Sequence, residues 1–185
     1  MMSKLSSMCK KRILYAVIIA VGILLDQITK LLAVRYLKPV GSFPLWKGVF
    51  HLRYVENPGA AFGMLENHPW VFMVFSTVAI LLLGFYLFWG KSYLSEKDER
   101  GGYPEIDWFS GVAIALIVTG GIGNMIDRIA TRILYQRGFV VDFFDFALID
   151  FAVFNVADSF VTVGAVLLAL SLVLSIIKEQ KKKEK

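Results

Sequence analysis

The sequence has few residues suited to disulfide or metal chemistry, because its 185 residues include one cysteine and two histidines. One cysteine excludes a disulfide framework, and these three residues cannot supply the usual four N and S ligands of a structural zinc site. Charged residues are also scarce, at 19% against about 25% in soluble domains. Hydrophobic residues make up 57%, where soluble domains have about 45–50%. The composition excludes a disordered chain and favours one that lies in lipid.

The positive charge gathers at the two ends of the chain, although a net charge of +5 could by itself suggest nucleic acid. Two terminal clusters hold nine of the 20 basic residues: Lys4, Lys10, Lys11, Arg12, Lys178, Lys181, Lys182, Lys183 and Lys185. Both clusters flank apolar runs, as basic residues beside membrane spans do. We therefore expect membrane lipid as a partner and no nucleic acid.

Four apolar stretches are long enough for a bilayer-crossing helix, which needs about 20 such residues. They cover residues 13–34, 70–89, 108–129 and 154–177. The alternative, buried helices of a soluble all-α protein, fits poorly because the second stretch contains no charge. The first is too long for a cleaved signal peptide, and no small-residue cleavage site follows it. The sequence therefore predicts a membrane all-α fold, as one integral-membrane domain over residues 1–185.

The basic tails predict how the spans are oriented. Four spans put both termini on one side, and the basic tails 1–12 and 178–185 predict that this side is the cytoplasm. The inner segments, including the linker 90–107, then hold twelve basic residues and the outer segments eight. The polar residues embedded in the spans all fall near the outer surface: Asp26, Asn124, Asp127, Arg128, Asn155 and Asp158. Polar residues placed at random would fall near both membrane surfaces. Their position near one surface therefore predicts a functional site there.

Two Asn-x-x-Asp pairs lie at this level, Asn124 with Asp127 and Asn155 with Asp158. Residues three apart share a helix face, so each pair presents both side chains to one side. The structural alternative is an interhelical hydrogen-bond clamp, which suits Asp127 better than Asp158 because only Asp127 has a cation beside it. Asp26 likewise has Lys30 four residues on, which is the spacing of a helix-face ion pair.

Three further acids, Asp142, Asp145 and Asp150, lie around an aromatic run in the outer loop after the third span. Two carboxylates held close in a dry site cannot both ionise, so one keeps a proton while the other accepts one. Such a pair can activate a water molecule for attack on an amide carbonyl. Spacing alone leaves open which of the three acids would partner Asp158.

The first outer segment, residues 36–69, is not predicted to span the membrane. Residues 50–55 alternate in the manner of a half-buried strand. Residues 57–63, Asn-Pro-Gly-Ala-Ala-Phe-Gly, form a turn of small residues. Small residues let backbone approach a ligand closely, and a plain connecting turn is the alternative.

Five motifs in chain order resemble the lipoprotein signal peptidases, or signal peptidase II, of bacterial inner membranes. They are Asp26-Gln27-x-x-Lys30, Asn57-x-Gly59-Ala60-Ala61-Phe62-Gly63, Gly120-Gly121-x-Gly123-Asn124-x-x-Asp127-Arg128, Gly138-x-Val140-x-Asp142-Phe143 and Phe154-Asn155-x-Ala157-Asp158-Ser159. The match covers about residues 26–169. Any one of these motifs alone is weak evidence for the family, whereas five in this order within four spans are specific to it.

The resemblance implies an aspartic endopeptidase with four membrane helices and a small extracytoplasmic β cradle between spans one and two. Its substrate would be a prolipoprotein whose lipobox cysteine carries a diacylglyceryl group, cut N-terminal to that cysteine. By the same resemblance the catalytic aspartates are Asp142 and Asp158. The residues implied to support the site are Asp26, Asn57, Gly59, Asn124, Asp127, Arg128 and Asn155. No metal or other cofactor is expected, and the enzyme would act as a monomer in the bacterial inner membrane, with its site at the extracytoplasmic face.

The sequence departs from the family in one spacing, and two other functions are alternatives. Arg128 and Asp142 are 14 positions apart, more than is usual in the family, and residues 133–136 are expected to form a loop insertion. A small proton- or ion-coupled transporter is one alternative, because embedded carboxylates also serve proton relays. Transporters, however, usually show internal repeats and sites near the midplane. A non-catalytic assembly protein, whose polar residues only join helices, is the other.

Overall fold

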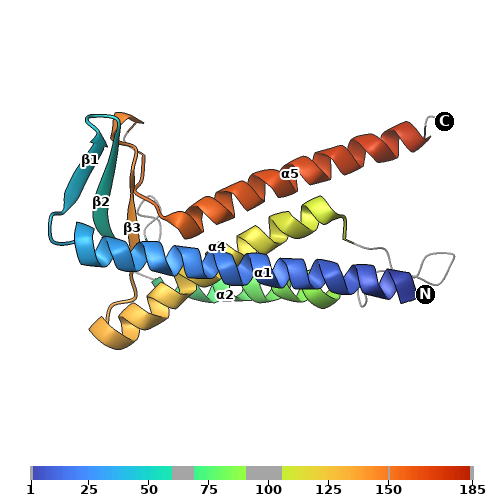
Figure 1. Cartoon of the computed structure of the whole chain (residues 1–185), viewed down its shortest axis with the longest axis horizontal. Coiled ribbons are helices and arrows are strands. Elements are labelled where there is room, and N and C mark those ends of the chain that lie inside the picture. The colour runs from blue at the N-terminus through green and yellow to red at the C-terminus, as the bar shows by residue number, and fades with distance from the viewer. Residues whose placement is uncertain (1, 60–68, 91–105, 150, 184–185) are drawn as a thin grey trace.

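The computed structural model describes residues 2–59, 69–90, 106–149 and 151–183 (Figure 1). Its long helices are α1 (Met2–Leu32), α2 (Pro69–Phe85), α4 (Trp108–Tyr135) and α5 (Val156–Lys183). The π-helical turns η1 (Ala33–Leu37) and η2 (Tyr86–Gly90) extend α1 and α2. The chain termini lie at one end of the helices and the β sheet at the other (Figure 1).

Four helical segments are long and apolar enough to cross a membrane. They are Met8–Leu37, Met73–Gly90, Trp108–Tyr135 and Val156–Lys178. Many of their large apolar side chains are exposed, as expected of surfaces that face lipid rather than water. The four predicted spans are therefore confirmed.

Both ends of the chain are more helical than predicted. α1 begins at Met2 and so includes the basic tail predicted at residues 1–12, apart from its first residue. α5 continues to Lys183 through most of the tail predicted at residues 178–185. Hydropathy marks where a helix can enter lipid and gives no signal for where it ends in water, which explains the difference.

The predicted loop insertion at residues 133–136 is wrong, because α4 continues through Tyr135. No glycine or proline interrupts this stretch, so nothing ends the helix before Gln136, which adopts a left-handed conformation with φ 57°. Arg132 Nη1 donates to Gln136 O at 3.1 Å and satisfies one of the last carbonyls. The Thr131 hydroxyl then exchanges hydrogen bonds of 2.8 and 2.9 Å with the backbone of Phe139. These hydrogen bonds hold the chain that follows the additional helical turn against α4.

A three-stranded antiparallel sheet lies at the far end from the termini, with strand order β1-β2-β3. Its strands are β1 (Ser42–Trp46), β2 (Phe50–Asn57) and β3 (Val140–Asp145). β2 contains the strand predicted at residues 50–55. The third strand follows α4, so the predicted cradle is built from two separate outer segments. Asp142 consequently lies on β3, opposite Val55, and not in a loop as predicted.

β3 is held against the C-terminal end of α1 by a buried apolar cluster of Ala33, Leu37, Phe139, Val141 and Phe143. Successive side chains of a strand point to opposite faces. With its two neighbours committed to this cluster, Asp142 points away from it.

α4 is the central helix and packs against α1, α2 and α5. Small residues let these helices approach closely. A Cβ added at Gly164 would lie 2.7 Å from Ala113 O, and one added at Gly123 would lie 2.6 Å from Asp26 Oδ2. This close packing brings polar residues of α1, α4 and α5 to one level beneath β3.

Candidate active site

The site is built at the N-terminus of α5, where Asn155 precedes the first helical residue. Asn155 Oδ1 accepts from the backbone N of Asp158 at 2.9 Å, and Asp158 Oδ2 accepts from the backbone N of Asn155 at 3.1 Å. This reciprocal arrangement is a capping box, in which the cap and the third helical residue each satisfy a backbone N–H of the other. The second Asn-x-x-Asp pair is thus a helix cap that holds the Asp158 carboxylate in one place.

Asp142 reaches the same helix cap from β3. Its Oδ1 accepts from Asn155 Nδ2 at 2.6 Å, and its Oδ2 accepts from Asn57 Nδ2 at 2.8 Å. Asn155 therefore donates to both carboxylates, with its side-chain amide to Asp142 and with its backbone to Asp158. The structure brings these two aspartates together through one shared residue.

The other two outer acids are placed differently. Asp145 lies further along β3, with its Oδ2 4.0 Å from Arg53 Nη1. Asp150 lies outside the described residues. Among the outer acids that the structure describes, Asp142 is the one that shares a partner with Asp158.

Burial controls the titration of Asp142, whose side chain is 2% exposed. Loss of water around the carboxyl, followed by the nearby charge of Asp158, raises the pKa of Asp142 to about 7. The hydrogen bonds from Asn57 and Asn155 favour the carboxylate and oppose this rise. A carboxyl with such a pKa exchanges its proton near neutral pH, as a catalytic acid or base must.

Asn124 contacts Asp158 from α4. Its Nδ2 donates to Asp158 Oδ1 at 2.7 Å. Its Oδ1 accepts from Lys30 Nζ at 2.9 Å and from Asn155 Nδ2 at 3.0 Å. Because two donors surround this oxygen, the amide is fixed with its NH₂ group towards Asp158.

Lys30 supports the site from α1, although the predicted set of site residues did not include it. Its side chain is almost fully buried, with Nζ 2.9 Å from Asp26 Oδ2 and 3.2 Å from Asp127 Oδ2. The ion pair suggested by the spacing of Asp26 and Lys30 is present. The sequence did carry a signal for Lys30, since a cation inside an apolar span needs partners within the bundle.

Asp127 takes partners from α1 and β3. Besides Lys30, Asp127 Oδ1 accepts from Gln27 Nε2 at 3.1 Å, and Asp127 Oδ2 accepts from the backbone N of Val141 at 3.0 Å. It is therefore a clamp between elements, as one of the alternatives proposed. Asp26 plays a comparable part, because its Oδ1 accepts from Ala157 N at the start of α5 at 2.9 Å.

Gly59 lies against Arg128. It has φ +109°, a backbone conformation that favours glycine, and a Cβ there would lie 3.0 Å from Arg128 Nη1. The Gly59 N–H donates to Asn57 Oδ1 at 2.8 Å, so the NH₂ group of Asn57 is left for Asp142. Residues 60–63 of the predicted small-residue turn lie outside the described residues.

The chemistry available here is acid and base chemistry by carboxyl groups. Within the described ranges, no group of three or more His, Cys, Asp or Glu could hold a metal ion. Asp142 and Asp158 are surrounded by amide donors, and the buried cation Lys30 contacts Asp26 and Asp127 instead. Two such carboxyl groups can act together as acid and base.

Comparison with known proteins supports this interpretation. Residues 18–174 match the family Signal peptidase (SPase) II. A lipoprotein signal peptidase of Caldanaerobacter subterraneus subsp. tengcongensis is 45% identical over 152 residues, which are 82% of this chain and 90% of that protein. A lipoprotein signal peptidase of Clostridioides difficile is 42% identical over 157 residues, or 85% and 93% of the two chains.

Solved structures agree with the sequence relatives. One bacterial membrane enzyme superposes with a TM-score of 0.67 at 28% identity and covers 88% of both chains. A second gives 0.66 at 29% identity, over 85% of this chain and 91% of the other. The resemblance noted in the sequence is confirmed.

The burial of Lys30 predicts a large effect of Lys30→Met on stability. The substitution leaves the carboxylates of Asp26 and Asp127 buried without their cation, and breaking a buried ion pair costs about 3–5 kcal/mol. We expect a markedly lower midpoint of thermal unfolding for the purified protein in detergent.

Lys38→Met is the matched control. Lys38 Nζ lies 2.9 Å from Glu56 Oε1, but the Lys38 side chain is 49% exposed. Exposed ion pairs contribute only about 0–1 kcal/mol. Equal shifts in the two variants would contradict the central role of Lys30.

Proposed function

The chain belongs to the signal peptidase II family and is an aspartic peptidase, and from this premise we propose that it cleaves prolipoproteins at a lipidated cysteine. The substrate is a precursor whose lipobox cysteine carries a diacylglyceryl group. The bond cut lies N-terminal to that cysteine, so the signal peptide is released. The observation that carries the proposal is the shared donor Asn155, which holds Asp142 and Asp158 in one cluster.

Asp142 and Asp158 are the proposed catalytic pair. Asp158 lies in the first turn of α5, where the positive end of the helix dipole favours a carboxylate. It also accepts hydrogen bonds from Asn124 and from the backbone of Asn155. Asp142 is the more deprived of water and keeps its proton up to about neutral pH, so we assign the shared proton to it.

The reaction then needs two proton transfers in each of two steps. Asp158 takes a proton from water as the water oxygen bonds to the carbonyl carbon, while Asp142 gives its proton to the carbonyl oxygen. In the second step Asp158 returns a proton to the leaving nitrogen as the C–N bond breaks. Asp142 takes one from a hydroxyl of the intermediate as the new carbonyl forms, which restores the starting state.

The other predicted site residues act through this pair. Asn57, Asn124 and Asn155 position the carboxylates by direct hydrogen bonds. Asp26 and Asp127 hold the start of α5 and the strand β3 that carry them. We propose that Gly59 and Arg128 bind the substrate backbone at the mouth of the site.

We also propose that the site faces the extracytoplasmic side of a bacterial inner membrane and that both termini face the cytoplasm. The termini lie together at the end of the bundle that carries the basic clusters, and the sheet lies at the opposite end (Figure 1). Basic residues prefer the cytoplasmic side. The active unit is proposed to be the single chain.

Asp142→Asn and Asp158→Asn are each expected to lower kcat for a diacylglyceryl-modified precursor by about 10²–10⁴-fold or more, because each removes a proton-transfer group. The measurement is cleavage of a synthetic lipidated precursor by the purified protein. Asp145→Asn is the matched control, since it makes the same change on β3 outside the cluster, and it should retain activity. Normal cleavage by either cluster variant, with unfolding midpoints unchanged, would remove the pair from catalysis.

The pH profile of kcat/KM is expected to have an alkaline limb, in which kcat/KM falls, near pH 7. Asp142 has its pKa raised to about 7, so its proton is present below that pH and is lost above it. kcat/KM should therefore fall as the pH rises through about 7. In Asn57→Ala a hydrogen bond that lowers the pKa of Asp142 is gone, so the limb should move to higher pH. A limb that does not move in this variant would argue against Asp142 as the proton donor.

Orientation can be tested by cysteine labelling in a Cys9→Ser background, which removes the native thiol. Lys47→Cys lies between β1 and β2 and should react with an impermeant reagent added outside intact cells. Lys181→Cys lies near the end of α5 and should react only after the membrane is opened. The reverse pattern would invert the proposed topology.

A further inference from the structure

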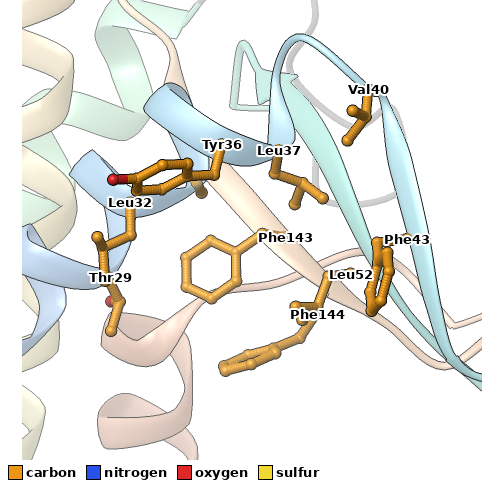
Figure 2. Close-up of a pocket in the computed structure, with 10 residues that line it drawn as sticks. Thr29, Leu32, Tyr36, Leu37, Val40, Phe43, Leu52, Phe143 and Phe144 are labelled. Carbon is orange, nitrogen blue, oxygen red and sulfur yellow. The ribbon is translucent and has the colours of Figure 1, made fainter.

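An apolar cavity of about 600 Å³ lies between the C-terminal end of α1 and the β sheet (Figure 2). Leu32 and Tyr36 line it from the helical side. Leu52, Phe143 and Phe144 line it from β2 and β3. The volume is within the range of about 300–1,000 Å³ that small-molecule sites occupy.

The lining suits hydrocarbon rather than a polar ligand. Among the described residues that line it, none is charged, and the side-chain hydroxyls come from Thr29 and Tyr36. The Thr29 hydroxyl already donates to Asp26 O at 2.8 Å within α1. A polar group placed inside would lose its water without gaining partners, which costs free energy.

The cavity is open towards the lipid-facing surface of α1. Leu32 is 51% exposed although it lines the cavity, and Leu31 beside it is 68% exposed. Both belong to the membrane-spanning segment Met8–Leu37. A hydrocarbon chain can therefore pass from the bilayer into the cavity without crossing a polar surface.

The two walls of the cavity continue directly into the candidate active site. Phe143 and Phe144, which line the cavity, follow Asp142 on β3, and Phe144 is on the same face of the strand as Asp142. On α1, Thr29 precedes Lys30. Since the rise of a strand is about 3.3 Å per residue, the backbones of Asp142 and Phe144 are about 7 Å apart, and a ligand whose reacting bond lies at Asp142 can reach the cavity.

We propose that the cavity holds one acyl chain of the diacylglyceryl group on the substrate cysteine, an assignment that rests on the proposed function. The second chain remains in the bilayer. The uncharged lining suits a glyceryl ester better than the phosphate of a bilayer phospholipid. Holding one chain here fixes the cysteine, and with it the bond to be cut, beside Asp142.

The test fills the cavity and compares substrates that differ only in acyl length. Leu32→Trp places a large side chain at the cavity wall, and Leu31→Trp makes the same change on the neighbouring lipid-facing position. The substrates are one lipobox peptide carrying either dipalmitoylglyceryl or dibutyrylglyceryl cysteine. We expect Leu32→Trp to lower kcat/KM for the long-chain substrate by about tenfold or more, through KM. Its kcat/KM for the short-chain substrate should equal that of Leu31→Trp.

Three results would overturn the assignment, and a fourth would overturn its premise. Leu32→Trp could match Leu31→Trp on both substrates, or it could lower both equally, which would indicate distortion of the site. Added phospholipid could also lower kcat/KM of the unsubstituted protein for the long-chain substrate as much as Leu32→Trp does. That result would assign the cavity to bilayer lipid. Failure of the unsubstituted protein to cleave either substrate would instead reject the proposed function.

Discussion

The ammonium group of Lys30 is buried inside an apolar helical bundle, where a charge is tolerated only with close partners of opposite sign. Asp26 and Asp127 supply those partners at 2.9 and 3.2 Å. Each of the two carboxylates has a further contact, Asp26 with the backbone N of Ala157 and Asp127 with that of Val141. One buried charge thereby fixes where α5 begins and where β3 passes. These are the elements that carry the proposed catalytic carboxyl groups.

The cation is also kept away from direct contact with that pair. The neutral amide donors of Asn57 and Asn155 lower the pKa of Asp142 but do not outweigh the effect of burial. Burial and the charge of Asp158 then raise the pKa of Asp142 to about 7. Neutral donors position the carboxyl groups, and Lys30 positions the elements beneath them. Separating these tasks allows a rigid site to contain a carboxyl that titrates near neutral pH.

The sequence was sufficient to predict the four spans and the level of the polar residues, because both depend on local hydropathy. It could not predict the partners of the polar residues, which depend on packing between distant segments. Asp127 shows this, since Lys30 is 97 positions away along the chain and Arg128 is adjacent. β3 was missed for a related reason: its strand character depends on pairing with β2, which lies before α2. The end of α4 was also missed, because the loop at residues 133–136 was inferred from the long spacing between Arg128 and Asp142, although no glycine or proline stops the helix there.

The depth of the site follows from the length of α1 and the open edge of the sheet. The span Met8–Leu37 has 30 residues, which rise about 45 Å in a helix, whereas the hydrocarbon core is about 30 Å thick. Its last turns can therefore extend beyond the core. β1 is an edge strand with exposed side chains, and unpaired backbone groups require water or headgroups, so the sheet lies outside the hydrocarbon. The cavity and Asp142 then lie at the interface between them, which is where the proposed substrate, a cysteine attached to lipid on one side and to peptide on the other, would be held.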